Sequence, residues 1–94
     1  MMDVDNLKKL SFSRDEYARR LGAVQALMAD RDIDVLLCHN LANICYLSGF
    51  HTLGSYGYGH YALVVPCEGD PILLASDFES HNARIVSWVS DLVT

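Results

Sequence analysis

The sequence predicts an α/β domain, and three observations lead to that class. An amphipathic segment with helical spacing is followed by a compact apolar run of strand type, and two later apolar runs flank a glycine turn. A second amphipathic segment and the start of another strand give the order helix, strand, short helix, strand, strand, helix, strand. The sequence has no internal repeat, and its 94 residues allow one domain.

The first helix is predicted over residues 14–30. Ser13 and Glu16 have the spacing of a capping box, and Phe12 and Tyr17 have the spacing of a hydrophobic staple. The apolar face is expected to carry Tyr17, Leu21, Val24, Leu27 and Met28. The opposite face is expected to carry Arg14, Arg19, Gln25 and Asp30.

The run "IDVLLC" at residues 33–38 has almost no alternation of apolar and polar side chains. Such a run is typical of a strand buried on both faces, which predicts a mixed, largely parallel sheet covered by helices. Asn40 is expected to cap a short helix that ends at Gly49, where a left-handed residue is favoured.

The second half of the chain begins with a predicted hairpin. The strands "HYALVVPC" and "PILLAS" are joined by "EGD", in which Gly69 suits a positive φ. Ser76 and Glu79 repeat the capping-box spacing and predict a helix. Its apolar face is expected to include Phe78, Ile85 and Trp88 or Val89, and "VSDLVT" is expected to begin a fourth strand.

Composition and charge exclude several classes of function. The formal charge of −5, without a basic stripe, argues against nucleic acid as a partner. The first ten residues lack a signal-peptide core, and no apolar run reaches the length of about 20 residues that spans a bilayer. Cys38, Cys45 and Cys67 are expected to be reduced thiols in a cytoplasmic protein.

The residues alone do not predict an enzyme. The glycines at 54, 57 and 59 precede a strand, whereas a phosphate loop follows a strand and opens a helix. The histidines lack the spacing of metal ligands: His39, His51, His60 and His81. Cys38 and Cys45 remain candidate nucleophiles, although a core position is favoured for both. We therefore expect neither a catalytic residue nor a metal site in this chain.

The motifs taken together resemble a known family. "FSRDEYARRL", "IDVLLCHNLANICYLSGF" and "YALVVPCEGDPILLASDFE" are similar, in order and spacing, to the N-terminal domain of the creatinase and Xaa-Pro peptidase family. The most specific part is the motif formed by Asn43, Ile44, Tyr46, Leu47, Gly49 and Phe50. The segment "DFESHNARIVSW" and the tyrosine-rich loop are more similar to the creatinase-like and ectoine-hydrolase-like branches than to methionine aminopeptidases, which lack this domain.

The resemblance implies a ribonuclease H-like three-layer domain, here truncated at its C-terminal end. In this family the catalytic site lies in a C-terminal pita-bread domain, which residues 1–94 do not contain. That domain holds a divalent metal pair (Mn or Co) or, in creatinase, a metal-free histidine site. The implied partners are the catalytic domain, a second subunit in a homodimer, and a small-molecule or short-peptide substrate.

The stretch "HTLGSYGYGHY" at residues 51–61 is the candidate binding element. In creatinase-like members the corresponding loop reaches the substrate of the neighbouring subunit, which implies substrate contacts for Tyr56, Tyr58 and His60. Creatinase has an arginine there, and this loop has none, so a fixed bidentate cation for a carboxylate is missing. The alternative is that the tyrosines pack under the loop, and for Phe50 a core position is favoured.

Two hypotheses of function follow. The chain is the non-catalytic N-terminal domain of a dimeric C–N hydrolase acting on an Xaa-Pro peptide, creatine or ectoine, or it is a stand-alone α/β interaction module. The reading frame after Thr94 distinguishes them, because only the first hypothesis requires a downstream catalytic domain.

Overall fold

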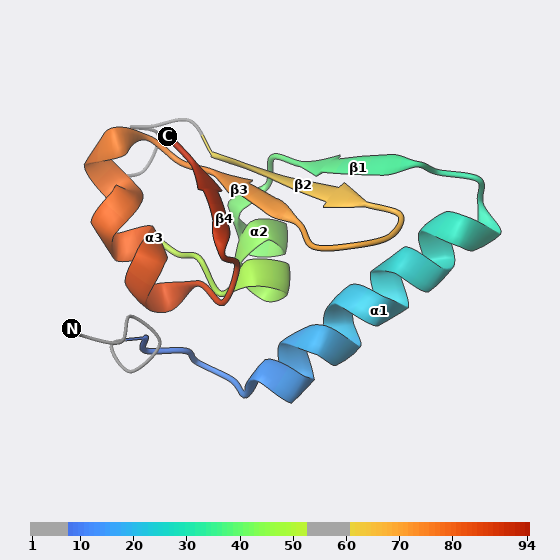
Figure 1. The fold of residues 1–94 in the computed structure, drawn as a ribbon, viewed down its shortest axis with the longest axis horizontal. Coiled ribbons are helices and arrows are strands. Elements are labelled where there is room, and N and C mark those ends of the chain that lie inside the picture. Colours follow the sequence, from blue (N-terminus) through green and yellow to red (C-terminus); the bar gives the residue numbers. More distant parts are fainter. Residues whose placement is uncertain (1–7, 53–60) are drawn as a thin grey trace.

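The computed structural model describes residues 8–52 and 61–94, which form helices and strands in the predicted order. The first half contains α1 (Arg14–Asp30), β1 (Val35–Cys38) and α2 (Leu41–Ser48). The second half contains β2 (Ala62–Pro66), β3 (Ile72–Leu74), the 3-10 turn η2 (Asp77–Glu79), α3 (Ser80–Val86) and β4 (Asp91–Val93). Figure 1 shows α3 beside β4 at one end of the domain, with α1 at the other. The α/β class is confirmed.

The strands of the described residues form one mixed sheet in the order β1-β2-β3-β4. β1 pairs with β2 and β2 with β3 in antiparallel fashion, and β3 pairs with β4 in parallel. The predicted hairpin of β2 and β3 is confirmed, and Gly69 in its turn has φ 98°. The expectation of largely parallel pairing is wrong, because two of these three pairs are antiparallel. Only β3 and β4, which are connected through η2 and α3, run parallel.

The helices cover one face of the sheet. A single buried cluster joins Met28 of α1, Ile44 of α2 and Val86 of α3 to alternate strand residues such as Leu63 and Leu73. The other face is also apolar but is open to solvent, and Leu37 there is 51% exposed. The expectation that the first strand is buried on both faces is therefore wrong for the described residues. They supply two of the three expected layers, one of helices and one sheet.

Helix α1 begins with the predicted Ser13 cap and hydrophobic staple, whereas the Glu16 carboxylate of the expected capping box accepts hydrogen bonds from Arg19 and Arg20. The Ser13 Oγ accepts a hydrogen bond from the Glu16 amide at 3.1 Å. The rings of Phe12 and Tyr17 meet edge to face with centroids 6.2 Å apart, which is the predicted staple. Two side chains differ from expectation: Leu27 is exposed, and Gln25 donates to the carbonyl oxygens of Pro66 and Gly69, which ties α1 to the hairpin turn.

Helix α2 is capped at both ends as predicted. The Asn40 Oδ1 accepts from the amides of Ala42 and Asn43, and Gly49 closes the helix at φ 85°. A Cβ at Gly49 would lie 2.6 Å from the Val86 carbonyl oxygen, so glycine also permits a close approach to α3.

The second predicted capping box does not form as expected. Ser76 precedes η2, but its side chain makes no cap hydrogen bond, and Glu79 is buried with its carboxylate accepting from Asn82. Phe78 was expected on the apolar face and is 89% exposed, because η2 turns it away from the core. Trp88 is partly buried, and its indole nitrogen donates to the Leu47 carbonyl at 2.7 Å.

Candidate functional site

Four strand ends meet at one edge of the sheet. Because β1 is antiparallel to β2, the end of β1 at Cys38 lies beside Leu63 at the start of β2. Ala62 pairs in turn with Leu74 at the end of β3, and Leu74 pairs with Val93 at the end of β4. Residues that follow or precede these ends are therefore brought together, although they are far apart in the sequence.

A groove of about 540 Å³ lies at this edge. Its lining is His39, Tyr61, Ala62, Leu74, Ala75, Ser76, Val93 and Thr94. Four of these eight side chains are apolar, and the polar groups are an imidazole, a phenol and the hydroxyls of Ser76 and Thr94. A pocket with apolar walls and a few polar groups is typical of a site for a small ligand.

His39 also lines a second groove of about 520 Å³ between α1, β1 and α2. This groove contains Asn40, Asn43 and Tyr46 among apolar side chains. The polar side chains that line the two grooves include both hydrogen-bond donors and acceptors, which suits the binding of a small ligand. Within residues 8–52 and 61–94, no group of three or more His, Cys, Asp or Glu side chains is placed to hold a metal ion.

The three predicted binding residues, Tyr56, Tyr58 and His60, lie outside the described residues. Their role therefore stays a prediction. The structure does locate both ends of the segment that contains them. The buried ring of Phe50 lies 5.4 Å from the ring of Tyr61, centre to centre, and Tyr61 lines the first groove. The predicted core position of Phe50 is confirmed.

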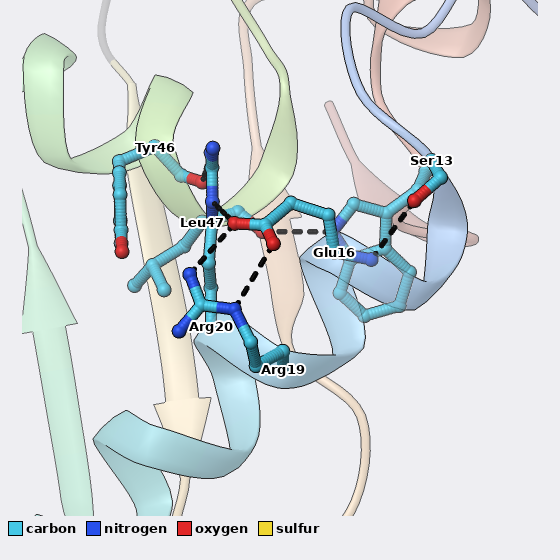
Figure 2. Close-up of polar contacts among 7 residues, drawn as sticks. Ser13, Glu16, Arg19, Arg20, Tyr46 and Leu47 are labelled. Carbon is cyan, nitrogen blue, oxygen red and sulfur yellow. Dashed lines mark hydrogen bonds and ion pairs between the residues drawn. The ribbon is translucent and has the colours of Figure 1, made fainter.

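The sequence analysis missed Arg20, whose side chain connects α1 to α2. Arg20 is only 9% exposed, and its guanidinium lies 4.4 Å from the Phe12 ring centre and 4.3 Å from that of Tyr46. It donates to the Glu16 carboxylate and to the Tyr46 carbonyl oxygen, both at 2.8 Å (Figure 2). A signal was present, because Arg20 is three residues from Tyr17 and therefore falls within the apolar face.

The Glu16 carboxylate is the electrostatic centre of this cluster. It accepts hydrogen bonds from Arg19 and Arg20, and these bonds lower the pKa of Glu16 from 4.5 to about 2. The same carboxylate raises the pKa of the Arg19 guanidinium above its ordinary value. The two arginines thus share one carboxylate, and both favour its ionised form.

The three cysteines are free, and each has a different exposure. Cys38 is buried, whereas Cys45 and Cys67 are partly buried. Burial raises the pKa of the Cys38 thiol, which disfavours the nucleophilic thiolate. The core position predicted for Cys38 is therefore confirmed.

In the described part of the chain, no helix has the length and apolar character needed to cross a bilayer.

Comparisons with known proteins agree with this fold. The family model of the creatinase/prolidase N-terminal domain matches residues 20–94. The ectoine hydrolase of Halomonas elongata is 34% identical over 80 residues, which cover 85% of this chain and 20% of that protein.

Two solved structures have the same fold. An Xaa-Pro aminopeptidase from Streptococcus pyogenes has a TM-score of 0.70 at 20% identity, covering 86% of this chain and 57% of the other. A proline dipeptidase from Streptococcus pneumoniae has a TM-score of 0.67 at 23% identity, covering 79% and 53%. The chain thus spans about half the length of these structures and a fifth of the curated relative. It belongs to the creatinase/prolidase N-terminal domain family.

Proposed function

We propose that this chain is the non-catalytic N-terminal part of a dimeric C–N bond hydrolase. The observation that carries the proposal is the ectoine hydrolase match, which covers 85% of this chain but only 20% of the relative. The reaction is then performed by a domain that follows residue 94. A reading frame that continues into a domain rich in carboxylates and histidine supports the proposal. A stop codon soon after Thr94 would instead favour a stand-alone interaction module.

The substrate is a small molecule or short peptide with a hydrolysable C–N bond. The relatives support this class, since one is an ectoine hydrolase and the others are named as a proline dipeptidase and an Xaa-Pro aminopeptidase. The groove at the sheet edge is of suitable size and offers imidazole, phenol and hydroxyl groups to such a ligand.

A divalent metal pair, of Mn or Co, would belong to the downstream domain. The described residues do not fit such a pair, because they bring no cluster of three metal-binding side chains together. We accordingly expect residues 1–94 alone to have no hydrolase activity. The free state of all three cysteines supports a reducing compartment, and we place the protein in the cytoplasm.

The role of this domain is to form the dimer and to line the partner subunit's active site with the loop that contains Tyr56, Tyr58 and His60. Both ends of that loop are anchored at the sheet edge, where Phe50 and Tyr61 pack together. Its glycines allow close backbone approach to a ligand.

Subunit mixing tests this role in the full-length enzyme. One subunit carries Tyr58→Phe and His60→Ala, and the other has an intact loop with a disabled catalytic domain. In the mixed dimer a working catalytic domain meets an intact loop from its neighbour, so activity is expected to return. Absence of recovery, with subunit exchange confirmed, would contradict action across the dimer.

A further inference from the structure

β1 is an edge strand of the sheet that the described residues form, and β2 pairs with one side of it. The hydrogen bond of 2.9 Å from the Cys67 amide to the Asp34 carbonyl oxygen fixes which residues of β1 bond to β2. Because backbone groups alternate between the two sides of a strand, Asp34 and Leu36 bond toward β2. The N–H and C=O groups of Val35 and Leu37 therefore point away from β2, toward the outer edge.

The outer edge of β1 is accessible. A groove of about 520 Å³ is lined by both Leu36 and Leu37, whose side chains point to opposite faces of the sheet, so the groove follows the edge itself. Val24 of α1 and Tyr46 of α2 form its wall on the helix side. On the open face, the side chains of Val35 and Leu37 are 57% and 51% exposed. This edge thus combines outward-facing backbone groups with exposed apolar side chains, an arrangement that suits pairing with another strand.

The edge is complementary to itself in one orientation. When two copies of β1 run antiparallel about a two-fold axis at Leu36, Val35 of each copy lies opposite Leu37 of the other. Both residues present their backbone groups outward, so each of these pairs exchanges both of its N–H···O=C bonds. Their apolar side chains then continue the open face of one sheet into the next.

Charge favours this antiparallel orientation. Asp32 and Asp34 are exposed and lie directly before β1. An in-register parallel pairing would place these carboxylates beside the same carboxylates of the second copy, which is destabilising. In the antiparallel pairing, Asp34 lies opposite Cys38 and Asp32 lies opposite Asn40, and neither partner is an acidic residue.

We propose that a second copy of this protein docks on the outer edge of β1, and that antiparallel pairing of the two β1 strands about Leu36 joins the two sheets into one. The backbone groups of Val35 and Leu37 supply the hydrogen bonds, and their side chains supply the apolar contact. The inference rests on the proposed function in one respect, the dimer, for which it names the interface.

Disulfide trapping in the full-length protein tests the register. Leu36 lies on the two-fold axis in a non-hydrogen-bonded pair, whose Cα atoms are about 4.5 Å apart, within the range that a disulfide spans. Leu36→Cys, in a background whose native cysteines are replaced by alanine, is expected to form a covalent dimer under mild oxidation. Val35→Cys is the matched control, because its counterpart lies diagonally about 7–8 Å away, and it should cross-link poorly. Cross-linking at Val35 in preference to Leu36 would overturn the proposed pairing.

A second pair of variants tests the backbone bonds without cysteine chemistry. Val35→Pro removes an outward N–H at the first residue of an edge strand, a position that tolerates proline, whereas Val35→Ala keeps the N–H. Sedimentation is expected to give a dimer dissociation constant at least about tenfold higher for Val35→Pro than for Val35→Ala. Circular dichroism checks that both variants are folded, and equal dissociation constants in folded variants would overturn the inference. If Val35→Pro does not fold, the cross-linking at Leu36 decides alone.

The interface and the proposed function can fail separately. A dimer in sedimentation that gives no disulfide at Leu36 would overturn the interface and leave the dimeric hydrolase standing. A disulfide at Leu36 in a protein whose reading frame ends soon after Thr94 would support the interface and contradict the hydrolase. A monomeric protein would overturn the inference, while its hydrolase activity would still decide the catalytic part of the proposed function.

Discussion

The guanidinium carbon of Arg20 lies 4.3 Å from the centre of the Tyr46 ring, and Arg20 Nη1 donates to the Tyr46 carbonyl oxygen at 2.8 Å. One side chain of α1 thus holds both the ring and the backbone in the second half of α2. That helix ends at Gly49, directly before Phe50. The position at which the candidate binding loop starts therefore depends on a contact made by the first helix.

Arg20→Ala should lower the free energy of unfolding by about 2–4 kcal/mol. The variant loses contacts with the rings of Phe12, Tyr17 and Tyr46, each worth about 0.5–2 kcal/mol, and charged hydrogen bonds worth about 1.5–3 kcal/mol. These contributions are not additive. Urea unfolding followed by the fluorescence of Trp88, the single tryptophan, measures the change. Arg19→Ala is the control: Arg19 shares the same carboxylate but is exposed, so a clearly smaller loss of stability is expected. Equal losses in the two variants would contradict a special role of the buried arginine.

The ion pairs of Glu16 predict a specific dependence of stability on pH. The pKa of Glu16 in the folded protein is about 2, below its ordinary value of 4.5, because Arg19 and Arg20 donate to its carboxylate. The stabilisation is therefore complete above pH 4.5 and is lost as the pH falls toward 2. Wild-type protein and Glu16→Gln should differ in urea midpoint at pH 6, and the difference should disappear by about pH 2. A constant difference across this range would show that the carboxylate charge is not the cause.

Three glycines should respond differently to alanine. Gly49→Ala combines a positive φ of 85° with a Cβ only 2.6 Å from the Val86 carbonyl oxygen, so a loss of about 3 kcal/mol or more is expected. Gly69→Ala has the positive φ without the collision and should lose about 1 kcal/mol. Gly22→Ala lies in α1 with open space around it and should gain about 0.5–1 kcal/mol. Thermal unfolding of the three variants gives the order, and a mild effect at Gly49 would contradict the close approach of α2 to α3.

Local signals predicted the parts of the fold that depend on near neighbours in sequence. Ser13 and Asn40 start helices and Gly49 ends one, because each acts on amides or carbonyls within four residues. The direction of strand pairing could not be predicted in this way. The apolar run of β1 indicated burial on both faces, but its partner β2 lies beyond α2, and the sheet packs helices on one face only.

The candidate site shows the same division. The loop at 51–61 is visible in the sequence by composition. In contrast, the placement of His39 and Ser76 in one groove depends on the register of the whole sheet. Arg20 was missed because its partner Tyr46 is 26 residues away. Phe78 was misplaced because η2 replaces the first turn of the expected helix and exposes the ring. Such features follow from tertiary packing, which spacing alone does not contain.

The two faces of the sheet can be compared with one substitution at two leucines. Leu63 of β2 is fully buried toward the helices, whereas Leu37 of β1 lies on the open face and pairs with Val64. Leu63→Ala should lower the free energy of unfolding by about 2–5 kcal/mol, because it leaves a cavity in the core. Leu37→Ala removes the same atoms from a half-exposed position and should cost about 1 kcal/mol or less. Urea unfolding of residues 1–94 measures both values. A cost at Leu37 close to that at Leu63 would show that the open face is covered in solution and would restore the expectation of a strand buried on both sides.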